Sequence, residues 1–198
     1  MSSTSGGAGK SIVIHGHISA TPELFAGIFG AHVSSDSDLE ADCAIFAINP
    51  SAGIDPATIE LWKSYDEVQL PRMVIVTVLD GMELDFDDAV MVGNRVFDKL
   101  ITPYLVLHGE NGTPIGTISL RDLSTMDYST TPPTVGKSDH ELAELVEEFR
   151  TEFLEETEEF GEGSFAAGLL FPAIPVNPTN TLGIEIVTQY LSELPSRD

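Results

Sequence analysis

Residues 73–79 read MVIVTVL, an unbroken apolar run that is the strongest strand pattern in the chain. A continuous run of this kind is typical of a strand that is covered on both faces of a parallel sheet. Residues 43–48, CAIFAI, repeat the pattern, and a shorter β-branched run begins at residues 11–14 and continues to Ile18. We expect these segments to be strands of one sheet.

A helix is expected after each of these strands. Thr21 as the N-cap, Pro22 at the first helical position and Gly30 as the stop signal predict a helix that ends at Phe29. Residues 56–65 predict a second helix, and Asp85 caps a third whose apolar positions keep roughly helical spacing. Successive strand–helix units with short connections predict the α/β class, a mostly parallel sheet with helices on both faces.

The pattern changes after Thr102. Residues 104–107 and 115–120 read as a hairpin around the turn at 109–113, and a Thr/Pro-rich link follows at 129–136. A long, glutamate-rich helix is expected from residue 138 or 139 to Phe160, with its apolar stripe facing the core. Because a last strand (171–176) and a last helix (182–194) follow, we expect the parallel sheet to resume after a small inserted α+β subdomain at about 103–170. Residues 1–10 are expected to be a flexible tail and residues 11–198 a single domain.

The amino-acid composition excludes several classes of protein. The chain has 198 residues, 42% of them hydrophobic, which suffices for one globular domain with a buried core. Its 32 acidic and 9 basic residues give a net charge of -23, which argues against binding to nucleic acid or to an anionic membrane. The single cysteine, Cys43, cannot form an internal disulfide or a cysteine-rich zinc site, and no apolar run approaches the roughly 20 residues that cross a bilayer. A cytoplasmic protein is therefore expected.

Two stretches bear on phosphate binding. Residues 6–11, GGAGKS, are similar to the end of a phosphate-binding loop, but they precede the first strand, whereas such a loop follows a strand and opens a helix. We interpret this match as chance. The proper place for a phosphate loop is residues 15–23, HGHISATPE, after the first strand.

Residues 15–23 begin a resemblance to the G domain of the translational GTPases, in particular bacterial elongation factor G, whose first strand runs into an Ala-His-Ile-Asp-Ala-Gly-Lys-Thr-Thr loop. The resemblance is strongest over residues 42–97. There DCAIFAINPSAGIDP (42–56) is similar to the family's strand and Ala-Gly-Val-Gln-Pro turn, and Leu-Trp-Lys (61–63) and Leu-Pro-Arg (70–72) follow as in the family. The resemblance implies a P-loop NTPase-like G domain that carries the subdomain inserted in elongation factor G.

The family's nucleotide motifs are altered in this chain. Aligned on the resemblance, the glycine, lysine and magnesium-binding threonine of the phosphate loop fall on Thr21, Pro22 and Glu23. Of the guanine-binding Asn-Lys-Met-Asp motif only Asp80 remains, as a remnant guanine contact, and only residues 31–41 stand in place of both switch regions. No catalytic residue and no metal ligand can be assigned, so the parts that phosphoryl transfer requires are missing. The resemblance implies a degenerate G domain, a pseudo-GTPase that needs no cofactor and serves as a protein-interaction or regulatory module linked to translation.

Other readings stay open. The chain is alternatively a divergent GTPase or GTP-binding translation factor that uses Asp80 together with GTP and magnesium, or a small-molecule binder in the vacated crevice at the strand ends. His15 and His17 stand two apart on a strand, which places both on one face, and such spacing can hold a metal, but the matched position of His17 points to inherited packing instead. Cys43 is interpreted as a small core residue.

The acidic helix is the remaining candidate for function. Glu144, Glu148 and Glu155 lie on its expected exposed arc, which is either a solvated face or a docking surface for a basic protein. In elongation factor G the inserted subdomain presents an acidic helix to the ribosomal stalk protein. The resemblance therefore implies a protein partner such as that stalk protein, and the oligomeric state stays open.

Overall fold

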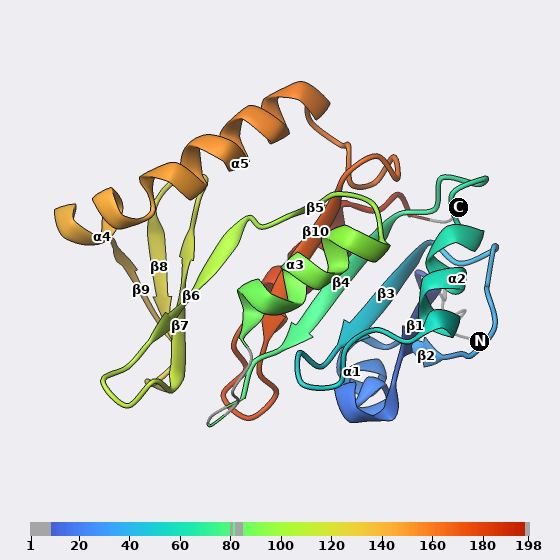
Figure 1. The fold of residues 1–198 in the computed structure, drawn as a ribbon, viewed down its shortest axis with the longest axis horizontal. Coiled ribbons are helices and arrows are strands. Elements are labelled where there is room, and N and C mark those ends of the chain that lie inside the picture. Colours follow the sequence, from blue (N-terminus) through green and yellow to red (C-terminus); the bar gives the residue numbers. More distant parts are fainter. Residues whose placement is uncertain (1–8, 80, 82–84, 197–198) are drawn as a thin grey trace, which may run out of the picture.

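Two β-sheets organise the protein (Figure 1). The computed structural model describes residues 9–79, 81 and 85–196. The larger sheet has six strands in the order β2-β1-β3-β4-β10-β5, and every neighbouring pair is parallel. Its strands are β1 (Ile12–Gly16), β2 (His32–Val33), β3 (Cys43–Ile48), β4 (Arg72–Thr77), β5 (Leu100–Ile101) and β10 (Phe171–Val176).

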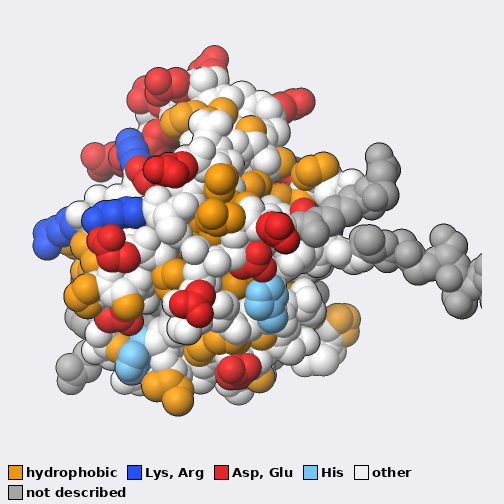
Figure 2. Space-filling model, turned by 90° about the vertical axis from the view of Figure 1, so that its right-hand side faces the viewer, with side chains coloured by type: hydrophobic (Ala, Val, Ile, Leu, Met, Phe, Trp, Pro, Cys, Tyr) orange, Lys and Arg blue, Asp and Glu red, His pale blue; other side chains and the backbone are white. Residues whose placement is uncertain are grey.

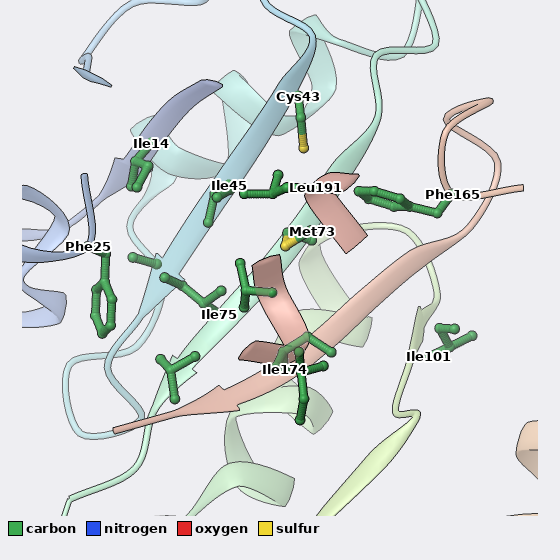
Figure 3. Close-up of a cluster of buried hydrophobic side chains, with 14 of the residues drawn as sticks. Ile14, Phe25, Cys43, Ile45, Met73, Ile75, Ile101, Phe165, Ile174 and Leu191 are labelled. Carbon is green, nitrogen blue, oxygen red and sulfur yellow. The ribbon is translucent and has the colours of Figure 1, made fainter. Parts of the chain in front are cut away.

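Helices cover both faces of this sheet, as the sequence predicts. Alternate residues of β3 point to opposite faces, so Ile45 lies in one apolar cluster and Phe46 in the other. Figure 3 shows the first cluster, to which Phe25 and Leu191 contribute from two helices. The first cluster is covered by α1 (Pro22–Phe29) and α6 (Ile184–Glu193), and the second by α2 (Pro56–Ser64) and α3 (Phe86–Val96).

The buried apolar runs form the strands that the sequence predicts. All six residues of β3 and of β4 are buried, as the parallel arrangement requires. The first strand is shorter than expected and ends at Gly16, where a Cβ atom would lie 2.5 Å from the carbonyl oxygen of Ala47 on the adjacent β3. Strands β2 and β5 are not expected from the sequence, since a strand of two residues leaves no readable pattern.

The inserted segment forms the second sheet, of four antiparallel strands in the order β6-β7-β8-β9. The expected hairpin is present as β6 (Tyr104–His108) and β7 (Pro114–Ser119), but the expected link at 129–136 in fact leads into a strand. The two strands that the sequence does not predict are short and rich in polar residues. They are β8 (Ser124–Asp127) and β9 (Thr134–Lys137).

The acidic helix lies along the second sheet in two pieces (Figure 1). Asp139 caps α4 (His140–Leu145), and α5 (Glu147–Phe160) follows directly. The prediction of a single helix is wrong at Val146, whose ψ of 2° lies outside the helical region. Its side chain is nevertheless buried. Residues 161–170 then return the chain to β10.

The ends of the chain lie mostly outside the described residues. The predicted tail, residues 1–10, is described only at Gly9 and Lys10. Lys10 donates through Nζ to the carbonyl oxygens of Leu191 (2.7 Å) and Ser192 (3.2 Å), at the C-terminal end of α6. A cation there complements the negative end of the helix dipole. Among the described helices, none is both long enough and apolar enough to cross a bilayer.

Candidate functional site

The loop after β1 is the segment that the sequence resemblance aligns with a phosphate-binding loop, and its amide groups bond within the loop itself. Residues Ile18–Ala20 form a 3-10 helix, η1, whose N-cap is His17. Nδ1 of His17 accepts from the amide of Ser19 at 3.2 Å, the amide of Ala20 donates to His17 O at 2.9 Å, and that of Thr21 to Ile18 O at 3.0 Å. A phosphate loop needs such amides free to donate to the anion. These three donors are already used.

Thr21, Pro22 and Glu23, which the resemblance aligns with the family's phosphate-loop residues, lie together at the start of α1. Thr21 is the N-cap, as expected, but it adopts the left-handed conformation (φ 50°) and its side chain makes no capping hydrogen bond. Pro22 is the first helical residue and has no amide hydrogen to offer. Glu23 lies in the first turn, where its exposed carboxylate complements the helix dipole. A carboxylate therefore takes the favourable position that an anionic ligand would otherwise occupy.

Asparagines follow two other strands at the same end of the sheet, and one of them, Asn49, contacts the loop after β1. Asn49, just after β3, donates through Nδ2 to Ser19 O at 3.0 Å and accepts from the amide of Ser51 at 3.0 Å. After β10, Asn177 accepts from the amide of Thr179 at 2.9 Å. Asp80, the predicted remnant guanine contact, lies outside the described residues and stays a prediction.

The two histidines do not form a pair. His15 is fully buried on β1, whereas His17 lies beyond the end of the strand and is exposed. The expectation that both point from one strand face is wrong, because β1 ends at Gly16 and the chain turns into η1. Among the described residues, no group of three His, Cys, Asp or Glu side chains is arranged to hold a metal.

His15 instead joins three segments through a buried hydrogen-bond chain. Its Nδ1 lies 2.8 Å from the Ser34 carbonyl oxygen, which can only accept, so Nδ1 carries the proton. Its Nε2 then accepts from the Tyr65 hydroxyl at 2.7 Å, and that hydroxyl accepts from the amide of Asp38 at 2.9 Å. Burial lowers the pKa of His15, which keeps the ring neutral, as these hydrogen bonds require.

These hydrogen bonds fix residues 34–38, part of the short segment that the sequence resemblance places where the family has its switch regions. His15 and Tyr65 hold the two ends of this stretch, and Nε2 of His32 on β2 lies 3.3 Å from a carboxylate oxygen of Asp38. Sequence reasoning missed Tyr65, which follows α2 and carries no motif that would have identified it. Cys43 is fully buried, and burial raises the pKa of its thiol, so it is an inert core residue as predicted.

The acidic helix exposes the residues that the sequence singled out. Glu144, Glu148 and Glu155 are exposed and line a shallow groove of about 570 Å³ with three neighbouring residues of α5, Glu147, Thr151 and Glu152. Figure 2 shows acidic side chains gathered at the top of the molecule, where Figure 1 places the C-terminal part of α5. The groove is therefore lined almost entirely by carboxylates.

The apolar stripe of this helix is only partly buried, contrary to expectation. Val146 and Phe153 face the core, but Leu145 is 75% exposed and Phe149 is 49% exposed. Leu145 ends α4 and Phe149 lies in the first turn of α5, next in sequence to Glu144 and Glu148. The exposed surface of this helix therefore contains two large apolar side chains among its carboxylates.

Comparison with known proteins identifies proteins that are similar in sequence to this chain. No family model matches it. Two curated proteins of Mycobacterium tuberculosis, from strains CDC 1551 / Oshkosh and ATCC 25618 / H37Rv, are each named "Elongation factor G-like protein" and are 28% identical to it over 174 residues. Each alignment covers 75% of this chain and 24% of the relative, so the chain spans about a quarter of their length.

A solved structure agrees with this likeness. A crystal structure of a Thermus thermophilus protein matches with a TM-score of 0.67 at 24% sequence identity, over 79% of this chain and 27% of that one. In this chain that fold consists of the six-stranded parallel sheet with helices on both faces and the second, antiparallel sheet. The chain is thus similar to part of the elongation factor G-like proteins and has an elongation factor G-like fold.

Proposed function

We propose that this chain is a translation-factor-like domain that has lost nucleotide chemistry and acts as a protein-interaction module. The observation that carries the proposal is the loop after β1, whose amides at Ser19, Ala20 and Thr21 bond within the loop. Seating a triphosphate there would require breaking these bonds and placing the anion beside Glu23. Pro22, at the position of the family's lysine, supplies neither a cation nor an amide hydrogen.

The short segment between α1 and β3 supports the same proposal. Phosphoryl transfer needs a held magnesium ion and a positioned water, both of which move with switch elements in GTPases. Here residues 34–38 are tied down by partly buried hydrogen bonds to His15 and Tyr65. A segment so fixed is poorly suited to switching between nucleotide states.

Titration calorimetry with Mg·GTP tests this proposal. We expect no binding tighter than a Kd of about 1 mM, because the loop offers no cation and its amides at 19–21 are already bonded. Binding by the unaltered chain is compared with binding by a variant that carries the family's residues, Thr21→Gly, Pro22→Lys and Glu23→Thr. Micromolar binding by the unaltered chain, lost on Asp80→Ala, would contradict the proposal and favour the alternative of a GTP-binding factor.

The interaction surface that we propose is the acidic helix, comprising Leu145, Phe149, Glu144, Glu148 and Glu155. Apolar side chains that become desolvated at the centre of an interface carry much of its binding energy, while surrounding charges steer the encounter. A partner with a basic surface around an apolar pocket matches this pattern. The ribosomal stalk protein is the proposed partner, in line with the elongation factor G-like resemblance.

Charge reversal tests the surface. Changing Glu144, Glu148 and Glu155 to lysine is expected to weaken binding to the stalk protein at least about tenfold, because attraction becomes repulsion. A matched control changes the exposed residues Asp36, Glu67 and Glu110 to lysine, so the net charge of the chain changes equally.

Binding is measured by surface plasmon resonance at two salt concentrations. If both charge-reversed proteins lose the same affinity, net charge alone governs the encounter and the helix is not the docking surface. Phe149→Ala supplies a second readout, since loss of an anchor side chain is expected to raise the dissociation rate rather than slow association.

A further inference from the structure

A cleft of about 1110 Å³ lies between the antiparallel sheet and the body of the protein. One wall comes from β6 and the turn after β7, the second from α5, and the third from α6, with residues 161–165 at the rim. Its volume slightly exceeds the range of about 300–1,000 Å³ that is usual for small-molecule sites. The cleft lies apart from the loop after β1 and from the exposed acidic groove.

Aromatic rings form much of the wall. Phe165 and Tyr190 pack edge to face with their centroids 5.2 Å apart, and Tyr104 and Phe153 line the cleft as well. Burial raises the pKa of both tyrosines, which keeps their hydroxyls protonated. Phe153 and Phe165 are themselves almost fully buried, so the ring surface that a ligand can reach comes mainly from the partly exposed Tyr104 and Tyr190. These two rings offer apolar faces together with neutral hydroxyl groups.

The charges of the cleft are mostly negative. Its carboxylates are Asp122, Glu158, Glu162 and Glu193, against a single guanidinium, that of Arg121. Arg121 lies over the ring of Phe153, with its Cζ atom 5.8 Å from the ring centroid. Within the described part of the chain, no ion pair within 4 Å involves Glu158, Glu162 or Glu193. These three carboxylates are available to a ligand.

We propose that this cleft binds a linear polyamine, with its methylene chain along the aromatic wall and its ammonium groups at Glu158, Glu162 and Glu193. Ammonium groups are attracted both to carboxylates and to the faces of aromatic rings. A phosphorylated or carboxylated ligand meets four carboxylates and only one cation, and the described residues contain no three-ligand cluster for a metal ion. The inference does not depend on the proposed loss of nucleotide binding.

Calorimetry with spermidine tests this site, with the full chain at near-physiological salt. Any acidic protein attracts polyamines, so two variants with the same loss of charge are compared. One changes Glu158, Glu162 and Glu193 to glutamine, and the other changes Glu144, Glu148 and Glu155 to glutamine. We expect the cleft variant to bind spermidine about tenfold more weakly and the helix variant to stay within about threefold of the parent.

Equal weakening in the two variants would overturn the proposal, because it would indicate non-specific attraction. Thermal unfolding of both variants confirms that each is folded before binding is compared. Magnesium chloride at matched ionic strength is expected to displace little spermidine, since Mg²⁺ lacks the chain that contacts Tyr104 and Tyr190. A lysine-rich peptide that binds this cleft more tightly than spermidine would also overturn it, and would assign the cleft to a protein segment.

Discussion

Replacing Gly183 with alanine is expected to lower the free energy of unfolding by about 4 kcal/mol, the combined cost of backbone strain and overpacking. Gly183 is the N-cap of α6 and has a φ of 77°, a conformation that side chains other than glycine rarely adopt. A Cβ atom built there would overlap the carbonyl oxygen of Pro175 on the buried strand β10. Since that oxygen belongs to the backbone of a buried strand, it cannot move aside cheaply.

Gly30, the C-cap of α1, provides the matched control for Gly183→Ala. Its backbone is also left-handed, with a φ of 65° and a ψ of 35°, but no atom lies within 4 Å of a Cβ built there. Gly30→Ala is therefore expected to cost only about 1 kcal/mol, from backbone strain alone. Urea unfolding followed by the fluorescence of Trp62, the single tryptophan, measures both. Similar losses for the two variants would mean that the overlap with Pro175 is relieved and that the close approach of α6 to β10 is not strict.

The central strands are predictable because their burial is complete. In β3 and β4 every residue is buried, so a continuous apolar run is sufficient to identify each strand. The strands β8 and β9 lie toward the outer edge of the antiparallel sheet, and all four residues of β9 are exposed. Their pairing comes from neighbouring strands rather than from an apolar pattern, so no run of residues in the sequence marks them.

The acidic helix shows a different limit of periodicity. Spacing indicates which residues share one face of a helix, but it does not say how wide the covering surface is. Val146 and Phe153 reach the core, while Leu145 and Phe149 extend past it and stay exposed. The exposed apolar pair, which gives the proposed docking surface its anchors, could be recognised only in three dimensions.

The position of the candidate site follows from the sequence, but its hydrogen bonding does not. Residues 21–23 do follow the first strand and open α1, at the place of a phosphate loop. The use of the loop's own amides, with His17 as the cap, depends on a 3-10 turn that no motif predicts. Spacing alone pairs His15 with His17, and only the structure separates them, because the strand ends between the two.

Tyr65→Phe is expected to lower the free energy of unfolding by about 2 kcal/mol. The substitution keeps the buried ring but removes the hydroxyl that donates to Nε2 of His15 and accepts from the amide of Asp38. The acceptor nitrogen of a fully buried histidine is then left without its partner, and the segment at 34–38 loses one of its anchors. The cost measured by urea unfolding should exceed that of an exposed Tyr-to-Phe change, which is close to zero.

The pH dependence of stability gives an independent test of the hydrogen bonds that link Ser34, His15 and Tyr65. Burial lowers the pKa of His15 below its ordinary value of 6.5, so the unfolded protein binds the proton more readily than the folded one. Stability contributed by the neutral ring is therefore complete above about pH 6.5 and is lost as the pH falls through the lower folded pKa. His15→Leu should lack this part of the loss between about pH 7 and pH 5, whatever its stability at neutral pH. If the two proteins lose stability in parallel over that interval, His15 is not held neutral between Ser34 and Tyr65, and the segment in place of the switches is fixed by other contacts.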